Sequence, residues 1–366
     1  MYKIDPTLNS DELIDHIRSR YQVTIQNIPK TKSYLTFINY SRLIDYLNKL
    51  SITEPKIDFI KVIKYYDFDR KLKLLAMDGI ERIEISFRAL LLNELVLSTK
   101  DEVWYCNKIY YHNQPGFEKT ITLFSKYILE QKDSFLILYF KKRYKTFDLE
   151  IWSEVANLFL RLSREIDTGI KANNNKIVKF KSIGKLGPKT INYLKMEIKN
   201  LPDSYAWMSD NINEFFINQK NISLLEIISY LLYTLKVPFY LIVDALTIGQ
   251  LSRLYPRLRT SFKQKIANKF KNGLQANSVK QHIDAISKLR NIIAHHDRLF
   301  NVSKLIKIDN FDTLTIFNGQ SAKVYFNLIS YYLNQIAPHN TFKIKLNDLI
   351  QRYVSKYNIH VNHWGF

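Results

Sequence analysis

Apolar residues recur at helical spacing along much of the chain. Between residues 57 and 97 they form one stripe, which consists of Leu72, Ala76, Ile80, Ile83, Phe87, Leu90 and Leu91. Such a stripe is typical of an amphipathic helix that packs one face against a core. Glycine and proline number only nine each in 366 residues, which favours long helices over turn-rich β architecture. The pattern therefore predicts an all-α fold, with minor β pieces near residues 177–183 and 305–317.

A second informative helix is predicted near the C-terminal third of the chain. Its apolar stripe consists of Ile283, Ile286, Leu289 and Ile293. Ser278 is a suitable N-cap residue for this helix. The polar side chains near its C-terminal end are Arg290, Asn291, His295, His296 and Arg298. This concentration of cationic and amide groups indicates either a binding site or a set of contacts to the helix terminus.

Helical geometry decides which of these polar groups share a face. At about 100° per residue, Asn291 and His295 lie about 40° apart. Arg290 points about 140° away from His295, so only the length of its side chain could bring both groups onto one ligand. A second copy of the helix, from another protomer, is the other way to supply the missing group.

Histidine and arginine together suit the cleavage of RNA without a metal ion. A histidine can accept the proton of the 2′-OH or protonate the leaving 5′-oxygen. An arginine can hold the scissile phosphate with paired donors and stabilise the charge that develops on it. The same side chains would also serve a helix terminus, by donating hydrogen bonds to its last carbonyls. Because Arg-x4-His is a short pattern, its spacing alone favours this structural interpretation.

A resemblance to known families changes that balance. The segment from Arg290 to His295 resembles the Arg-x4-6-His signature of HEPN ribonucleases, including the Asn that often follows the Arg. The longer run to Asn301 is similar to the end of the AbiD/AbiF-type abortive-infection family of phage-defence proteins. Ile293 and Phe300 stand where that family's pattern has Cys and Trp, and both keep an apolar group.

Other segments resemble further blocks of the same family, namely residues 40–43, residues 66–70 with 80–84, and residues 246–252. In the first block, Arg42 is expected to pair with Asp45 or a neighbouring helix, with contact to RNA as the alternative. In the second region, Glu84 and Arg88 could pair within their own helix. The resemblance implies instead that one of them packs near the helix of His295 and supports its side chains.

The resemblance implies an all-α, HEPN-like helical bundle and a metal-independent endoribonuclease that acts in abortive infection against phage. In the implied reaction, the RNA 2′-OH attacks the adjacent phosphate and leaves a 2′,3′-cyclic phosphate and a 5′-OH. His295 would be the acid–base group, Arg290 the phosphate clamp and Asn291 an orienting residue, with His296 and Arg298 secondary. HEPN enzymes typically build a site from two such helices, and this chain has one Arg-x4-His, so a homodimer is expected. No cofactor is expected.

The formal net charge of +20 makes RNA the first partner to consider, because cationic proteins bind polyanions with release of counterions. The candidate RNA-binding residues are Lys176, Lys179, Lys181, Lys185 and Lys189 in a lysine-rich stretch, and Arg253, Arg257, Arg259 and Lys263 after the third family block. A solvated surface is the alternative for the lysine-rich stretch. The main alternative function is a non-catalytic protein that holds a structured small noncoding RNA in a defence or toxin–antitoxin complex.

Other features restrict the class of protein. Cys106 is the only cysteine, which excludes an internal disulfide and a cysteine-based metal cluster, and the histidines are too dispersed for a recognisable metal site. The apolar stretch 228–248 is broken by Lys236, Pro238 and Asp244, which predicts two buried helices meeting at Pro238 and weakens a membrane-acting alternative. Residues 1–20 contain acids and no apolar core, so neither a secretion signal nor export is expected, and a cytoplasmic protein is predicted.

The chain is expected to divide into four segments. Residues 1–145 would form the N-terminal helical part of the bundle, and residues 146–235 an insertion with the lysine-rich stretch. Residues 236–303 would form the C-terminal part with the Arg-x4-His motif, and residues 304–366 an extension.

Overall fold

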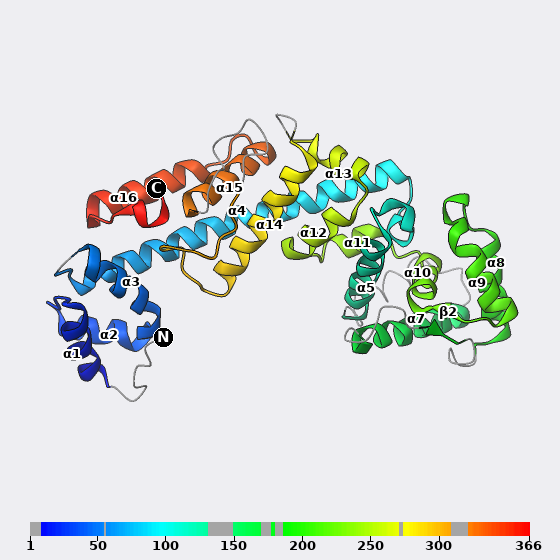
Figure 1. Cartoon of the computed structure of the whole chain (residues 1–366), viewed down its shortest axis with the longest axis horizontal. Helices are drawn as coiled ribbons and strands as arrows, with labels where there is room; N and C mark the ends of the chain where they lie inside the picture. Colours follow the sequence, from blue (N-terminus) through cyan, green and yellow to red (C-terminus); the bar gives the residue numbers. More distant parts are fainter. Residues whose placement is uncertain are drawn as a thin grey trace. The chain divides into compact units, whose positions relative to one another are not determined.

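A computed structural model describes residues 9–54, 56–130, 149–169, 177–179, 186–270, 274–308 and 321–366. The fold is all-α, as the sequence predicts, with a single pair of short strands among the described residues (Figure 1). The chain forms two compact units: Met1–Glu84 with Asp284–Phe366, and Ile85–Ile283. We call them the first and the second unit. The predicted division into four segments stays a prediction.

The first unit is built from both ends of the chain. Its helices are α1 (Ser10–Tyr21), α2 (Ile28–Phe37), α3 (Tyr40–Thr53), the first part of α4 (Phe59–Thr99), the last part of α14 (Ala276–Ala294), α15 (Ala322–Ile336), α16 (Phe342–Tyr357) and the 3-10 helix η7 (Val361–Trp364). The short helices begin at residues that suit their positions. Asn9 and Glu12 form a capping box on α1, and Asn39 caps α3 by accepting a hydrogen bond from the N–H of Ser41.

The helices α15 and α16 pack closely on the first part of α4 (Figure 1). A Cβ atom added at Gly79 of α4 would lie only 2.5 Å from Cγ2 of Ile329 in α15, so a glycine is required for this approach. The Tyr353 ring of α16 lies 5.1 Å from the ring of Phe68, centroid to centroid. The Tyr353 hydroxyl also donates to the carboxylate of Asp67. Residues far apart in the sequence thus form one core around α4.

The second unit contains the middle of the chain. Its α-helices are the rest of α4, α5 (Gln114–Glu130), α7 (Leu149–Gly169), α8 (Pro188–Lys199), α9 (Ala206–Asn218), α10 (Leu224–Thr234), α11 (Phe239–Val243), α12 (Ile248–Leu254), α13 (Thr260–Ala267) and the first part of α14. Its 3-10 helices are η1 (Trp104–Cys106), η2 (Lys108–Tyr110), η4 (Asp203–Tyr205) and η5 (Tyr255–Arg257). In this unit α5, α7 and α10 contact one another, and α8 packs against α9.

Pro238 separates two buried helices in the second unit, as the sequence predicts. The helix α10 ends at Thr234, and α11 begins directly after Pro238, which is its N-cap residue. Phe239 is fully buried, and its ring lies 4.9 Å from that of Trp104, centroid to centroid. No described helix is both long enough and apolar enough to cross a membrane.

Three other local predictions have mixed outcomes. Strand β1 (Ile177–Val178) lies within the predicted β piece and pairs antiparallel with β2 (Ile222–Ser223). The β piece near residues 305–317 falls mostly outside the described residues. The prediction of Ser278 as an N-cap is wrong, because α14 begins at Ala276 and encloses it. Ser278 is instead buried, and its hydroxyl oxygen has no hydrogen-bond partner among the described residues.

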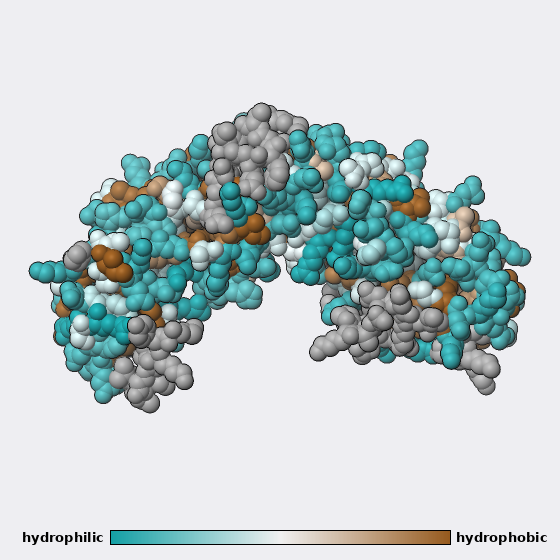
Figure 2. All heavy atoms as spheres, in the orientation of Figure 1, coloured by the Kyte–Doolittle hydropathy of each residue, from teal (hydrophilic) through white to brown (hydrophobic). Residues whose placement is uncertain are grey.

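The visible face of each unit is mostly hydrophilic (Figure 2). A few large apolar side chains are exposed in the first unit, including Phe37 at 85% and Ile52 at 77%. The surface thus agrees with a chain that buries its apolar stripes and presents its many lysines to solvent.

Candidate functional site at the end of α14

The apolar stripe of α14 fixes the orientation of the helix. Ile283, Ile286, Leu289 and Ile293 are all buried, as predicted from their spacing. Arg290 lies beside this stripe and is half-buried, whereas Asn291 and His295 are exposed. Arg290 Nη1 lies 3.4 Å from Asn291 Oδ1, a long contact for a hydrogen bond. The described chain shows no hydrogen bond between Arg290 and His295, so one copy of the helix leaves the two groups separate.

The helix ends in a Schellman arrangement centred on His296. The N–H of His296 donates to the carbonyl oxygen of Ile293, and the N–H of Asp297 donates to that of Ile292, each at 2.9 Å. His296 has a φ of 58°, in the left-handed region where glycine is usual. A side chain there costs about 1 kcal/mol relative to glycine. These backbone bonds, rather than the side chains of Arg290 or His295, satisfy the helix terminus.

Two cationic side chains donate hydrogen bonds to backbone carbonyl groups of the turn that follows the helix. Arg42 Nη1 donates to the carbonyl oxygen of His296 at 3.0 Å, and Lys73 Nζ donates to that of Asp297 at 3.3 Å. Arg42 comes from α3 and Lys73 from α4. Of the two contacts expected for Arg42, the structure shows the one to a neighbouring helix, at the turn that ends α14, whereas Asp45 pairs with Arg298. Three separate parts of the chain therefore meet at this turn.

The next residues are held by a buried carboxylate in α4. Asp69 is fully buried and accepts hydrogen bonds from the N–H of Leu299 at 3.0 Å and from Trp364 Nε1 at 2.7 Å. Lys73 Nζ lies 3.3 Å from the same carboxylate. Burial raises the pKa of Asp69, although Lys73 and the other donors act in the opposite direction.

Residues 361–364, which form η7, pack on the loop that contains Leu299, Phe300 and Asn301. The N–H of Asn301 donates to the carbonyl oxygen of His363 at 2.9 Å. Phe300 contacts the rings of His363 and Trp364, with centroid distances of 4.7 Å and 5.2 Å. Burial lowers the pKa of His363. The 3-10 helix at the C-terminus thus packs on the segment that directly follows the motif.

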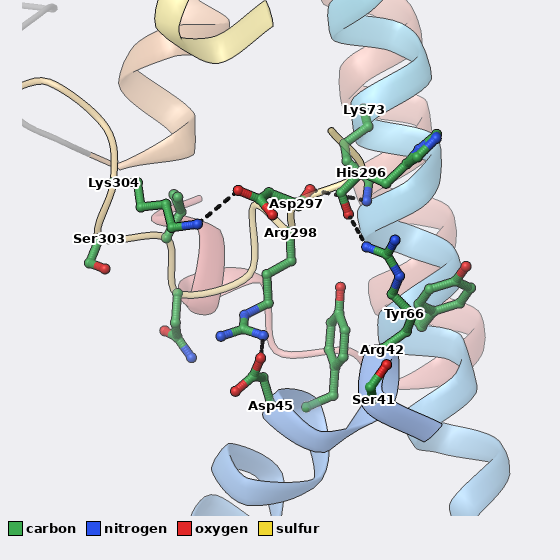
Figure 3. A pocket seen from close by; sticks show the side chains of 13 residues that line it. Ser41, Arg42, Asp45, Tyr66, Lys73, His296, Asp297, Arg298, Ser303 and Lys304 are labelled. Atoms are coloured by element: carbon green, nitrogen blue, oxygen red, sulfur yellow. Dashed lines mark hydrogen bonds and ion pairs between the residues drawn. The ribbon is translucent and has the colours of Figure 1, made fainter. Parts of the chain in front are cut away.

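A cavity of about 350 Å³ opens beside this turn (Figure 3). Its cationic lining residues are Arg42, Lys73, Arg298 and Lys304, and its acidic ones are Asp45 and Asp297. His296 also lines it, whereas Arg290, Asn291 and His295 do not. Of the predicted site residues, the structure therefore brings the secondary pair, His296 and Arg298, into one cavity.

The carboxylates of the cavity are both engaged. Asp45 pairs with Arg298, and Lys304 Nζ lies 2.8 Å from Asp297 Oδ2. The hydrogen bond from Lys304 lowers the pKa of Asp297, and the positive charge of Lys304 acts in the same direction.

The supporting residues predicted in α4 have different surroundings. Arg88 Nε donates to the carbonyl oxygen of Leu246 at 2.7 Å, within the second unit. This bond joins α4 to residues 246–252, the third segment that resembles the family. Glu84 is half-buried in the first unit. A supporting role for either residue at the helix of His295 stays a prediction.

The cationic residues after the third segment all belong to the second unit. The charge of Arg253 helps to lower the pKa of Arg257, after the larger effect of burial. Burial and the nearby Lys280 lower the pKa of Lys263 in the same way. Arg259 is exposed, and Arg257 Nη1 lies 3.4 Å from Thr120 Oγ1, so one member of the group has a structural contact.

The lysine-rich stretch is described only in part. Lys179 and Lys189 are exposed, and Lys176, Lys181 and Lys185 lie outside the described residues. Among the described residues there is no group of three or more His, Cys, Asp or Glu side chains that could hold a metal ion.

Sequence reasoning missed Asp69, Lys73 and Trp364. Their partners lie up to 295 residues away along the chain, so local spacing carried no signal for them. The one available signal was the resemblance of residues 66–70 to a family block, which contains Asp69 but says nothing of its contacts.

The fold and site define an all-α protein with a cationic cavity at the end of a helix that carries Arg and His. Comparison with family models identifies the group to which it belongs. The family model described as Abi-like protein matches residues 33–181 and 153–301. These overlapping matches span most of the chain and include Arg42, Asp69 and the segment from Arg290 to Asn301. The chain therefore belongs to the Abi-like protein family, which points to abortive infection, a defence against phage.

Comparisons with curated proteins and with solved structures give no significant match to this chain.

Proposed function

We propose that this protein is a metal-independent endoribonuclease of HEPN type that acts in abortive infection. The observation that carries the proposal is the placement of His295. It is an exposed histidine at the end of a helix whose terminus is already satisfied by backbone bonds. Because the fold has no need of this imidazole for capping, the side chain is available for chemistry.

The reaction divides between two side chains. The 2′-oxygen of the RNA forms a bond to phosphorus, and the bond between phosphorus and the 5′-oxygen breaks. The 2′-OH loses a proton and the leaving 5′-oxygen gains one; His295 transfers one of these two protons and solvent water transfers the other, because imidazole can act as acid or base near neutral pH. The guanidinium of Arg290 holds the phosphate and stabilises its developing negative charge. Asn291, which contacts Arg290, orients that group.

The anchoring of the following loop supports this assignment. Catalytic side chains act best when they are held in place before the substrate binds. The backbone after His295 is fixed by Arg42 at His296, by Lys73 at Asp297 and by Asp69 at Leu299.

The proposed site needs a homodimer, in which the Arg290 of one protomer and the His295 of the other act on the same phosphate. Arg290 and His295 do not meet within one copy of α14, and the chain has one Arg-x4-His sequence. A second protomer could place its Arg290 opposite the His295 of the first, around a two-fold axis. Light scattering should then give about twice the mass of one 43.5 kDa chain.

The test is cleavage of RNA by purified protein in EDTA. The wild type should cleave RNA that copurifies with it or added transfer RNA, and His295→Ala should lose 10²–10⁴-fold in rate. The matched control is His339→Ala, because His339 is exposed in the same unit and outside the motif. Equal activity in the two variants would refute the assignment.

The same experiment decides the alternative function. The cationic residues of both units supply electrostatic attraction to RNA whether or not the protein cleaves it. Bound RNA that stays intact with the wild type, at every pH and without EDTA, would identify a non-catalytic RNA-binding protein.

A further inference from the structure

We propose that the cavity beside α14 is a subsite for a backbone phosphate of single-stranded RNA, next to the phosphate that is cleaved. The inference rests on the proposed function for the identity of the ligand. It rests on separate residues for the binding, because the proposed catalytic side chains do not line the cavity.

The balance of charge favours an anionic ligand. Four cationic side chains line the cavity against two carboxylates, and each carboxylate is already paired, Asp45 with Arg298 and Asp297 with Lys304. Arg42 forms no ion pair within the described part of the chain. Its one hydrogen bond there goes from Nη1 to the carbonyl of His296, which leaves its other N–H groups free for a ligand.

The neighbouring groups suit a phosphate. Figure 3 shows Arg42, His296 and Tyr66 on the side of the cavity formed by α4, with Ser303 and Lys304 across it. His296 has a φ of 58°, where glycine is usual, so the cavity wall carries an imidazole at a position that would otherwise have no side chain. Guanidinium, hydroxyl and imidazole groups are the usual ligands of nucleic-acid phosphates.

The volume of the cavity suits a single phosphate with its nucleotide, and its position next to His295 suits a phosphate adjacent to the one that is cleaved. Its volume of about 350 Å³ is near the lower end of the range for small-ligand pockets, which suits one nucleotide unit. His296 lines the cavity and directly follows His295 in the chain, and Arg42 Nη1 donates to the carbonyl oxygen of His296 at 3.0 Å. An RNA strand that places one phosphate in the cavity would therefore reach His295 with an adjacent one.

The first test measures how RNA affinity depends on salt, in a His295→Ala background that prevents cleavage. Arg42→Gln should lower the slope of log K against log salt by about 0.7, the value for one phosphate contact in a single strand. At about 0.1 M salt the same loss is about fivefold in affinity. The matched control is Arg352→Gln on α16, which removes an identical charge from an exposed position outside the cavity.

A second pair of variants leaves Arg42 and its hydrogen bond intact. Ser303 lines the cavity and is exposed, so a longer side chain can be placed there without loss of a buried contact. Ser303→Glu should bind single-stranded RNA at least about fivefold more weakly than Ser303→Gln, because only the former adds a negative charge beside the phosphate. This comparison stays informative if Arg42→Gln fails to fold.

The outcomes separate this proposal from the proposed function. An unchanged salt slope in Arg42→Gln, with no difference between the two Ser303 variants, would overturn the subsite even if the wild type cleaves RNA. A reduced slope in a wild type that never cleaves would support the subsite and refute the ribonuclease. Protection of the wild type against thermal unfolding by adenosine 5′-monophosphate, with RNA binding unaffected in both variant sets, would identify a free-nucleotide site and overturn the RNA subsite.

Discussion

Replacement of Asp69 by asparagine tests whether a buried carboxylate holds the loop that follows His295. The Asp69 side chain is fully buried and accepts hydrogen bonds from the backbone of Leu299 and from the indole of Trp364. Asparagine keeps the shape and one acceptor oxygen, but its amide nitrogen would face a donor. It also removes the counter-charge of Lys73, whose side chain is only 13% exposed.

The expected loss in the free energy of unfolding follows from these contacts. A buried donor without a partner costs about 1–3 kcal/mol. Removal of one member of a buried ion pair costs about 3–5 kcal/mol. The effects overlap at one site, so a total loss of about 3 kcal/mol is expected. The matched control is Asp15→Asn on α1, because Asp15 is 77% exposed and should cost at most about 0.5 kcal/mol.

Two measurements check this prediction. Urea unfolding followed by circular dichroism gives the loss in stability of each variant. Hydrogen exchange gives the local effect, and the amide of Leu299 should exchange faster in Asp69→Asn because its acceptor is weakened. A loss no larger than that of Asp15→Asn, with unchanged exchange at Leu299, would refute the role of Asp69 as an anchor.

Further predictions concern strain, pH and packing in the first unit. His296→Gly should raise the free energy of unfolding by about 1 kcal/mol, because glycine adopts a φ of 58° without strain; no gain in urea unfolding would contradict this. Burial lowers the pKa of His363 from 6.5, so the neutral form stabilises the fold and stability should fall as pH drops below 6.5. His363→Gln should flatten the dependence of Tm on pH between about 7.5 and 5.5, and parallel curves would count against the effect. Gly79→Ala should cost about 1–3 kcal/mol in urea unfolding, since its Cβ would meet Ile329 at 2.5 Å; a neutral result would mean that α15 can move aside.

The helices themselves could be predicted because their apolar stripes are local. The stripe of α14 and the break at Pro238 depend on residues within a few turns of each other, and both are confirmed. The position of Ser278 was predicted wrongly because a residue that suits an N-cap is also tolerated inside a helix when tertiary packing extends the helix beyond it.

The surroundings of the motif could not be predicted in the same way. Arg42 reaches the carbonyl of His296 across 254 positions of sequence, and Asp45 pairs with Arg298 rather than with its neighbour. A guanidinium can pair with any carboxylate or carbonyl that the fold brings near, so its sequence neighbours do not determine its partner. The catalytic assignment of Arg290 and His295 came from the resemblance, and it stays a proposal.

The ends of the cleaved RNA test the central proposal most directly. Wild-type protein in EDTA should leave a 2′,3′-cyclic phosphate and a 5′-OH, and a substrate with 2′-deoxyribose at the cleaved position should stay intact. Both results follow from attack by the 2′-oxygen with His295 as the acid–base group. Products with a 3′-OH and a 5′-phosphate, or efficient cleavage of the 2′-deoxy substrate, would contradict the account.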